Sequence, residues 1–322
     1  MNGPALFLRA DAAAVAEPDY AAPFDALACI VEDAPGRMVF ENTLAHDDPI
    51  FAGHYPHFAI FPGVLIFEAF SQGIACMTRR HGGAALRVMR IKSLRFLKSM
   101  HPGDCYRITL EAGAADAAGV VDFAARCECA GELVATAALT AGPQLTPGPR
   151  AAADLLVPAV AASPQDLMHL HAVLPQRYPM LLLDRSLALD EGRSVLAQKN
   201  ISIGEPCYRF CRSLKQPLAL AYPTSLLIES FSQAVGLLLG SVWDMASAKD
   251  SHAIAFGTFQ DIVIHGHAYP GDRVVHHAEL DYANASTAMF RGSSYVDGVA
   301  ILTYKRLLGV MLPSAQLGAA QP

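Results

Sequence analysis

Three ionisable residues stand out in this sequence because their neighbours are mostly apolar. His54 lies in a loop rich in proline and aromatic residues, and Glu68 follows it by 14 residues. A second glutamate, Glu229, lies inside the most apolar stretch of the chain, residues 226–243. Imidazole titrates near neutrality, and burial among apolar side chains raises the pKa of a carboxyl group. These residue types therefore favour general acid–base catalysis.

The two glutamates belong to an internal repeat. The segment 61–73 recurs as 222–236, which begins 161 residues later. The shared positions are Pro62, Glu68, Ser71 and Gln72 in the first copy and Pro223, Glu229, Ser232 and Gln233 in the second. A Pro-Gly-Asp turn follows each copy, at 102–104 and 270–272. A period this long indicates a duplicated domain rather than a solenoid.

Each copy predicts the same elements around its glutamate. Proline is favoured in the first turn of a helix, so we expect an apolar helix of about 16 residues to begin near Pro62 and near Pro223. A strand pair should precede each helix, around Gly36 and Gly192, and four strands should follow it. The predicted strands are 90–98, 106–111, 120–129 and 133–140, then 254–265, 273–281, 288–295 and 299–310. This order predicts an α+β fold in which an antiparallel sheet wraps around each central helix.

Composition supports two folded domains. Hydrophobic residues make up 52% of the 322-residue chain and charged residues 17%, which excludes general disorder. We expect a flexible N-terminal arm (1–20), a first domain (21–145), a Pro/Ala-rich linker (146–164), a second domain (165–313) and a C-terminal tail (314–322).

Charge and cysteine content restrict the function class. The net charge of −6 argues against a nucleic-acid binder. We expect no secretory signal, because residues 1–16 do not contain a charged region followed by an apolar one. We expect no membrane span, because Glu229 and several polar residues interrupt the apolar stretch. Seven cysteines without a zinc-like spacing indicate reduced thiols, so we expect a cytoplasmic protein.

The loop around His54 carries a family resemblance. It reads Gly-His-Tyr-Pro, then Pro-Gly-Val at 62–64, then a helix with a glutamate before a glutamine. This pattern resembles the 3-hydroxyacyl-(acyl carrier protein) dehydratases. The second copy resembles the same family at its start, where 174–185 reads LPQRYPMLLLDR. The resemblance implies a tandem double hot-dog fold, a fused pseudo-dimer whose two sheets join edge to edge.

The resemblance also implies where the active site lies. In the family each site forms between two hot-dog units, so His54 and Gly63 of the first copy would meet Glu229 and Gln233 of the second. His54 would be the base, Glu229 the acid and the Gly63 N–H the oxyanion donor, with Tyr55 and Phe58 lining the pocket. The reciprocal site would hold Glu68 and Gln72 as a vestigial pair, because residues 206–223 contain no histidine and no Pro-Gly-Val.

The implied substrate is a 3-hydroxyacyl chain on the phosphopantetheine arm of an acyl carrier protein, converted in fatty-acid-like or polyketide biosynthesis without a cofactor or a metal. Basic residues between 79 and 98 provide a docking patch for the acidic carrier, with Arg79, Arg80 and Arg87 as the main candidates, or form only a solvated strand edge. Histidines 265, 267, 276 and 277 fit strand alternation better than a metal site. The alternatives are a catalytically silent acyl- or carrier-binding subunit and a hydratase or thioesterase acting on acyl-CoA.

Overall fold

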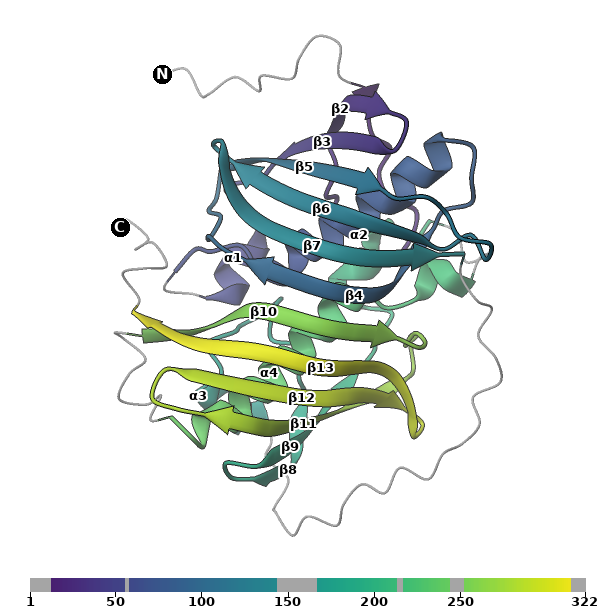
Figure 1. Ribbon diagram of the computed structural model, residues 1–322. Helices are drawn as coiled ribbons and strands as arrows, with labels where there is room; N and C mark the ends of the chain where they lie inside the picture. Colours follow the sequence, from purple (N-terminus) through teal and green to yellow (C-terminus); the bar gives the residue numbers. More distant parts are fainter. Residues whose placement is uncertain (1–12, 56–57, 144–166, 213–216, 244–251, 314–322) are drawn as a thin grey trace.

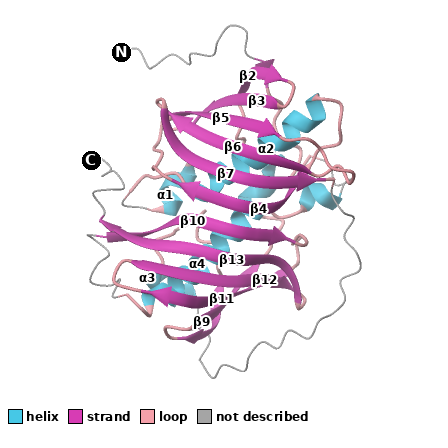
Figure 2. Ribbon diagram, in the orientation of Figure 1, coloured by secondary structure: helices cyan, strands magenta, loops and turns pink. Residues whose placement is uncertain are grey.

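The computed structural model describes residues 13–55, 58–143, 167–212, 217–243 and 252–313. Within these residues the strands form one 13-stranded sheet, and the two long helices lie together on one of its faces (Figures 1 and 2). No helix in the described ranges is both long and apolar enough to span a membrane.

The first unit contains two helices and seven strands. The helices are α1 (Pro49–His54) and α2 (Gly63–Arg80). The strands are β1 (Ala13–Ala14), β2 (Cys29–Ala34), β3 (Arg37–Thr43), β4 (Arg87–Phe96), β5 (Cys105–Ala112), β6 (Val121–Cys129) and β7 (Glu132–Gly142).

The second unit repeats this plan. Its helices are α3 (Leu167–Val173), the short 3-10 helices η1 (Pro206–Phe210) and η2 (Pro217–Leu220), and α4 (Thr224–Gly240). Its strands are β8 (Arg185–Asp190), β9 (Ser194–Asn200), β10 (His252–Ile264), β11 (Arg273–Ala283), β12 (Thr287–Val296) and β13 (Val299–Pro313).

The two units join edge to edge through β4 and β10. The strand order is β1-β2-β3-β5-β6-β7-β4-β10-β13-β12-β11-β9-β8, so β4 and β10 are the neighbours at the centre. They pair antiparallel, with Arg95 opposite Thr258 and Ile91 opposite Ile262. The antiparallel sheet and the pseudo-dimer confirm the predicted fold. Joining the units in this way leaves no exposed sheet edge at their boundary.

Both long helices begin directly after a proline, as predicted. Pro62 and Pro223 have φ values of −60° and −55° and precede the first helical residues Gly63 and Thr224. Helices α2 and α4 contact each other as well as the sheet. Most residues of α4 are buried, which explains why its sequence is apolar on nearly every side.

The structure adds detail to two expected segments. The predicted N-terminal arm overlaps the described chain at residues 13–20, where β1 pairs with β2 and Asp19 accepts a hydrogen bond from the Arg212 N–H of the second unit at 2.9 Å. These residues are therefore tied to the protein. The predicted linker (146–164) and tail (314–322) lie outside the described residues.

Candidate active site

His54 is the last residue of the short helix α1. The side chain of Asp48 caps this helix by accepting a hydrogen bond from the Ile50 N–H at 2.9 Å, and Pro49 occupies its first turn. The second unit packs directly against Gly53, where a Cβ atom would lie 2.8 Å from the Pro179 side chain. Gly53 therefore lets the two units approach closely enough to hold His54 at their boundary.

The ring of His54 is oriented by one hydrogen bond. Nδ1 lies 3.1 Å from the Ile60 carbonyl oxygen, which can only accept, so the proton is on Nδ1 and the lone pair is on Nε2. The ring of Tyr55 packs edge-on at 4.7 Å between centroids. Burial lowers the pKa of His54 to about 4, so the ring is neutral at pH 7.

Glu229 projects from the buried side of α4 and is 5% exposed. Gln233, one helical turn further on, donates to the Glu229 carboxyl at 3.0 Å. The Gln233 amide is itself fixed, because it also donates to the Met180 carbonyl at 2.6 Å and accepts from the Leu182 N–H at 2.9 Å. Burial raises the pKa of Glu229 to about 7, and hydrogen bonds from Gln233 and Gln176 partly oppose that rise.

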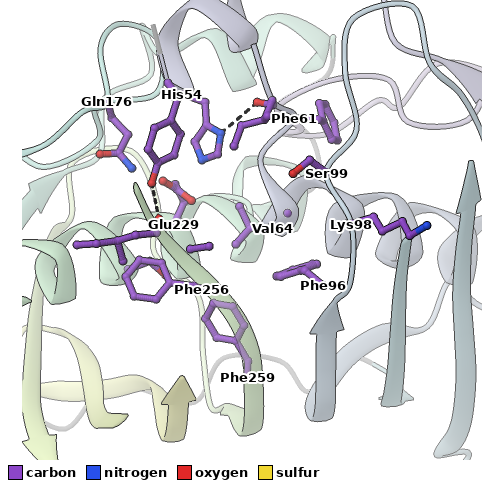
Figure 3. A pocket seen from close by; sticks show the side chains of 16 residues that line it. His54, Phe61, Val64, Phe96, Lys98, Ser99, Gln176, Glu229, Phe256 and Phe259 are labelled. Atoms are coloured by element: carbon purple, nitrogen blue, oxygen red, sulfur yellow. Dashed lines mark hydrogen bonds between the residues drawn. The ribbon is translucent and has the colours of Figure 1, made fainter. Parts of the chain in front are cut away.

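His54 and Glu229 line the same pocket, although 175 positions separate them in the sequence (Figure 3). His54 belongs to the first unit and Glu229 to the second. The other lining residues are Tyr55, Ile60, Phe61, Gly63, Val64, Phe96, Lys98, Ser99, Gln176, Ser232, Ile254, Ala255, Phe256 and Phe259. The pocket thus holds a neutral imidazole and a carboxyl group whose pKa is close to neutral.

Gly63 places the start of α2 in this pocket. The first N–H groups of a helix have no partner within the helix and carry the positive end of its dipole. A Cβ atom at Gly63 would lie 2.9 Å from the ring of Phe96, so only glycine fits without displacing that ring. Developing negative charge on a bound carbonyl oxygen can therefore be stabilised here.

Tyr55 and Phe58 occupy different places. The Tyr55 hydroxyl donates to the Ile254 carbonyl of β10 at 2.6 Å, which ties the histidine loop to the second unit at the pocket wall. Phe58 packs beside Ile60, Tyr55 and Leu312 and is not among the lining residues. Phe58 therefore lies behind Ile60, which does line the pocket, and its role as a lining residue stays a prediction.

Glu68 lies in a second pocket, equivalent to the first by the repeat. The Ser225 hydroxyl donates to its carboxyl at 2.6 Å and Gln72 donates at 3.0 Å. Ser225 follows Pro223 at the position where Val64 follows Pro62, so the equivalent position of the first pocket carries no hydroxyl. Burial raises the pKa of Glu68, and the two hydrogen bonds oppose the rise.

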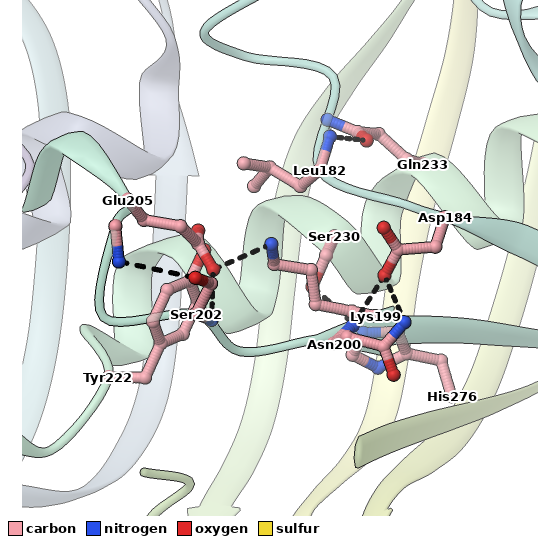
Figure 4. A network of polar contacts seen from close by, with 11 residues as sticks. Leu182, Asp184, Lys199, Asn200, Ser202, Glu205, Tyr222, Ser230, Gln233 and His276 are labelled. Atoms are coloured by element: carbon pink, nitrogen blue, oxygen red, sulfur yellow. Dashed lines mark hydrogen bonds and ion pairs between the residues drawn. The ribbon is translucent and has the colours of Figure 1, made fainter. Parts of the chain in front are cut away.

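A histidine that the sequence interpretation did not assign to this second pocket lines it. His267 enters from the segment after β10, whereas the loop before α4 contributes Tyr222 and the first residue of α4 is Thr224. That loop is held by a buried ion pair in which Lys199 Nζ lies 2.9 Å from Glu205, and the Tyr222 hydroxyl donates to the same carboxylate at 2.9 Å (Figure 4). The second unit thus replaces its histidine loop with a differently held segment.

His276 of β11 and His265 of the preceding loop have hydroxyl partners. His276 is buried between the Ser230 and Ser294 hydroxyls, each 2.8 Å from a ring nitrogen, and His265 lies 3.1 Å from the Thr303 hydroxyl. Within the described ranges, no group of three or more His, Cys, Asp or Glu side chains could hold a metal ion.

The three arginines expected to dock the carrier lie on the side of the second pocket. Arg87 lines that pocket and its guanidinium lies 5.2 Å from the ring centroid of Tyr20. Arg80 forms an ion pair with Asp33 at 3.0 Å, and Arg79 donates to the Ala75 carbonyl at 3.1 Å. The basic residue that lines the His54 pocket is Lys98.

Sequence reasoning missed Gln176, Ser99 and Lys98 as residues of the His54 pocket. Gln176 lies within the LPQRYPMLLLDR segment that carries the resemblance of the second copy, and this was the available signal. Nothing in the local pattern of Ser99 or Lys98 indicates a pocket. Their place depends on where β4 ends relative to α2.

Two family models match the chain, one in each unit. The model described as ApeI dehydratase matches residues 31–137, and the FabA-like domain model matches residues 174–305. The 3-hydroxyacyl-[acyl-carrier-protein] dehydratase FabZ of a Nitratiruptor species is 33% identical over 135 residues, which are 41% of this chain and 88% of that protein. The chain belongs to the 3-hydroxyacyl-[acyl-carrier-protein] dehydratase family. The dehydratase of the same name from Vibrio cholerae is 28% identical, over 41% of this chain and 83% of that protein.

Solved structures resemble this dehydratase-family chain over both units. The dehydratase domain from the CurJ module of the Curacin polyketide synthase superposes with a TM-score of 0.61 at 12% identity, covering 89% of this chain and 96% of that one. The dehydratase domain of PpsC from Mycobacterium tuberculosis, in complex with C12:1-CoA, gives 0.58 at 16% identity, covering 89% and 98%. At these identities the likeness establishes the shared double hot-dog fold.

Proposed function

We propose that this protein eliminates water from a 3-hydroxyacyl thioester on an acyl carrier protein and releases a 2-enoyl thioester, in fatty-acid-like or polyketide biosynthesis. The observation that carries the proposal is one pocket, shared by both units, that holds the neutral His54 ring and the protonatable Glu229. Membership in the dehydratase family supports the same reaction.

His54 acts as the base. Its Nε2 lone pair faces away from the Ile60 carbonyl that holds Nδ1, so it is free to take the proton from the carbon next to the thioester carbonyl. Negative charge then develops on the thioester oxygen. The N–H of Gly63, at the positive end of α2, stabilises that charge, and one such donor is worth about 3–4 kcal/mol in a transition state.

Glu229 acts as the acid. With a pKa of about 7 it is protonated in about half of the molecules at neutral pH, and the protonated form transfers its proton to the 3-hydroxyl oxygen as the C–O bond breaks and water leaves. The electron pair of the broken C–H bond becomes the new double bond. Transfer of the proton from the imidazolium to the Glu229 carboxylate restores both groups for the next turnover.

The acyl carrier protein is the proposed partner. Lys98 lies in the His54 pocket and its side chain is 48% exposed, so we propose that it meets the phosphopantetheine phosphate or the acidic carrier surface first. Arg79, Arg80 and Arg87 lie on the second-pocket side and would act through longer-range attraction.

The second pocket is proposed to be inactive. It holds Glu68 and Gln72, but Ser225 donates to that carboxyl and the loop before α4 has no histidine. The loop equivalent to the one that carries His54 therefore supplies no base to Glu68, and this difference carries the proposal.

The decisive experiment incubates the protein with a 3-hydroxyacyl carrier and follows the acyl chain by mass spectrometry. We expect loss of one water with the thioester intact, and none with His54→Ala. Release of the free acid would instead identify a thioesterase, and binding without conversion would identify a silent subunit. Conversion of the coenzyme A ester alone would move the substrate class from carrier protein to coenzyme A.

A further inference from the structure

One polar atom in the His54 pocket has no partner. The side-chain oxygen Oε1 of Gln176 is buried without a hydrogen-bond partner among the described residues, and the residue as a whole is 6% exposed. A buried acceptor that stays unpaired is unfavourable, because nothing compensates for the loss of its hydrogen bonds to water. Gln176 lines the pocket, so this covered oxygen lies close to the space that a bound molecule would occupy.

The position of Gln176 is set by both units. The next residue, Arg177, donates its backbone N–H to the Gly53 carbonyl at 2.7 Å, directly before His54. The Gln176 side chain also reaches Glu229, and its hydrogen bond lowers the pKa of that carboxyl. Donation to a carboxyl group comes from the amide nitrogen, which leaves the amide oxygen as the unpaired atom (Figure 3).

From this geometry we infer that the Gln176 oxygen accepts a hydrogen bond from the 3-hydroxyl group of the substrate and so selects 3-hydroxyacyl chains. The inference rests on the proposed function. The hydroxyl is the O–H donor next to the reacting carbons, and its oxygen is the atom that Glu229 protonates. A hydroxyl that receives the proton of Glu229 and donates to Gln176 is held by the two groups that already contact each other.

The second pocket provides an internal comparison. Gln72 bonds the backbone of Phe24 and Ala26 as Gln233 bonds that of Met180 and Leu182. In this correspondence between the two units, Tyr20 occupies the position equivalent to Gln176. Tyr20 and Arg87 stack there, so an amide at the position of Gln176 occurs only in the pocket that also holds His54.

The test measures binding in a His54→Ala background, in which the ligand is not consumed. The ligands are a 3-hydroxyacyl carrier and the saturated acyl carrier of the same length. Gln176→Leu should weaken binding of the hydroxyacyl carrier by about 3- to 10-fold, the worth of one neutral hydrogen bond, and leave the saturated carrier unchanged. Gln176→Met serves the same purpose if the leucine variant does not fold, and Tyr20→Phe is the matched control that should change neither affinity.

Two outcomes overturn the inference. Equal weakening of both ligands would assign Gln176 to the shared part of the substrate or to structure, and unchanged binding of both would mean that it makes no contact. In the enzyme with His54 intact, Gln176→Leu should also move the basic limb of the activity profile to higher pH, since Glu229 loses a donor. If the protein without substitutions neither dehydrates nor prefers the hydroxyacyl carrier, the proposed function itself fails, which is a separate result.

Discussion

At the scale of single residues, burial gives His54 and Glu229 opposite pKa shifts. Taking a charge out of water disfavours the imidazolium and the carboxylate alike, so the pKa of His54 falls to about 4 and that of Glu229 rises to about 7. Between these values the base is neutral and the acid is protonated. The same physical cause thus prepares both halves of a proton-transfer pair.

The pH dependence of kcat/KM should therefore be bell-shaped. Below about pH 4 His54 gains a proton and stops acting as a base, and above about pH 7 Glu229 loses the proton it must donate. We expect kcat/KM, measured with a small 3-hydroxyacyl thioester, to fall tenfold for each pH unit below the lower pKa or above the upper pKa. A basic limb above pH 9 would contradict the role of Glu229 as the acid.

Substitution of the two glutamates should have unequal effects. We expect His54→Ala and Glu229→Gln each to lower kcat by about 10²- to 10⁴-fold, and the double variant to be little worse than either, since the two groups act as one unit. Glu68→Gln, at the equivalent position of the repeat, is the matched control, and we expect it to lower kcat by less than about threefold. The assignment of the acid is wrong if Glu68→Gln abolishes turnover and Glu229→Gln is tolerated.

At the scale of elements, the start of α2 carries the proposed oxyanion donor, the N–H of Gly63. Gly63→Ala would place a Cβ atom 2.9 Å from the Phe96 ring, so either the ring or the helix end must move within the pocket. We expect kcat to fall by about tenfold or more. Complete removal of one oxyanion donor lowers kcat by about 10²- to 10³-fold, and a displaced Gly63 N–H should lose part of that effect.

Gly73→Ala is the control for this substitution. Gly73 lies in the same helix, and a Cβ atom there would meet the Leu110 side chain at 2.8 Å, away from the His54 pocket. It should lower the melting temperature without changing kcat in the folded protein. Equal losses of kcat in both variants would assign the Gly63 effect to general strain in α2.

At the scale of the whole molecule, the join between β4 and β10 brings the two units together so that one pocket contains groups from both. It also separates the basic side chains, with Lys98 at the His54 pocket and Arg87 at the second one. Surface charges act on association, and salt screens them over about 10 Å at 0.1 M ionic strength.

Charge reversal should therefore distinguish the two sides. Lys98→Glu should lower kcat/KM for a carrier-bound substrate several-fold and leave a small thioester nearly unaffected, with the difference shrinking at high salt. Replacing Arg79, Arg80 and Arg87 together by glutamate should also lower kcat/KM for the carrier-bound substrate, but by a smaller factor. Equal losses on carrier-bound and small substrates would exclude a docking role for either set.

Much of this organisation could be predicted from the sequence, because it depends on patterns among residues that are close together in the chain. The repeat, the prolines before both long helices and the alternating strands predicted those helices and the four strands after each of them to within a few residues, but not α1, α3 or the 3-10 helices. The family motif singled out His54 and Glu229. Hydrophobic periodicity and turn residues report on the residues nearest in the chain, and that is why these features were accessible.

Contacts between distant segments depended on the tertiary structure. Only the packed units show that Ser225 donates to Glu68, that Phe58 packs against Ile60 and that Arg87 lies beside the second pocket. The unpaired oxygen of Gln176 and the pKa values of His54 and Glu229 also exist only after folding. Burial is a property of everything that surrounds a group, and here both halves of the chain line the pocket that surrounds His54 and Glu229.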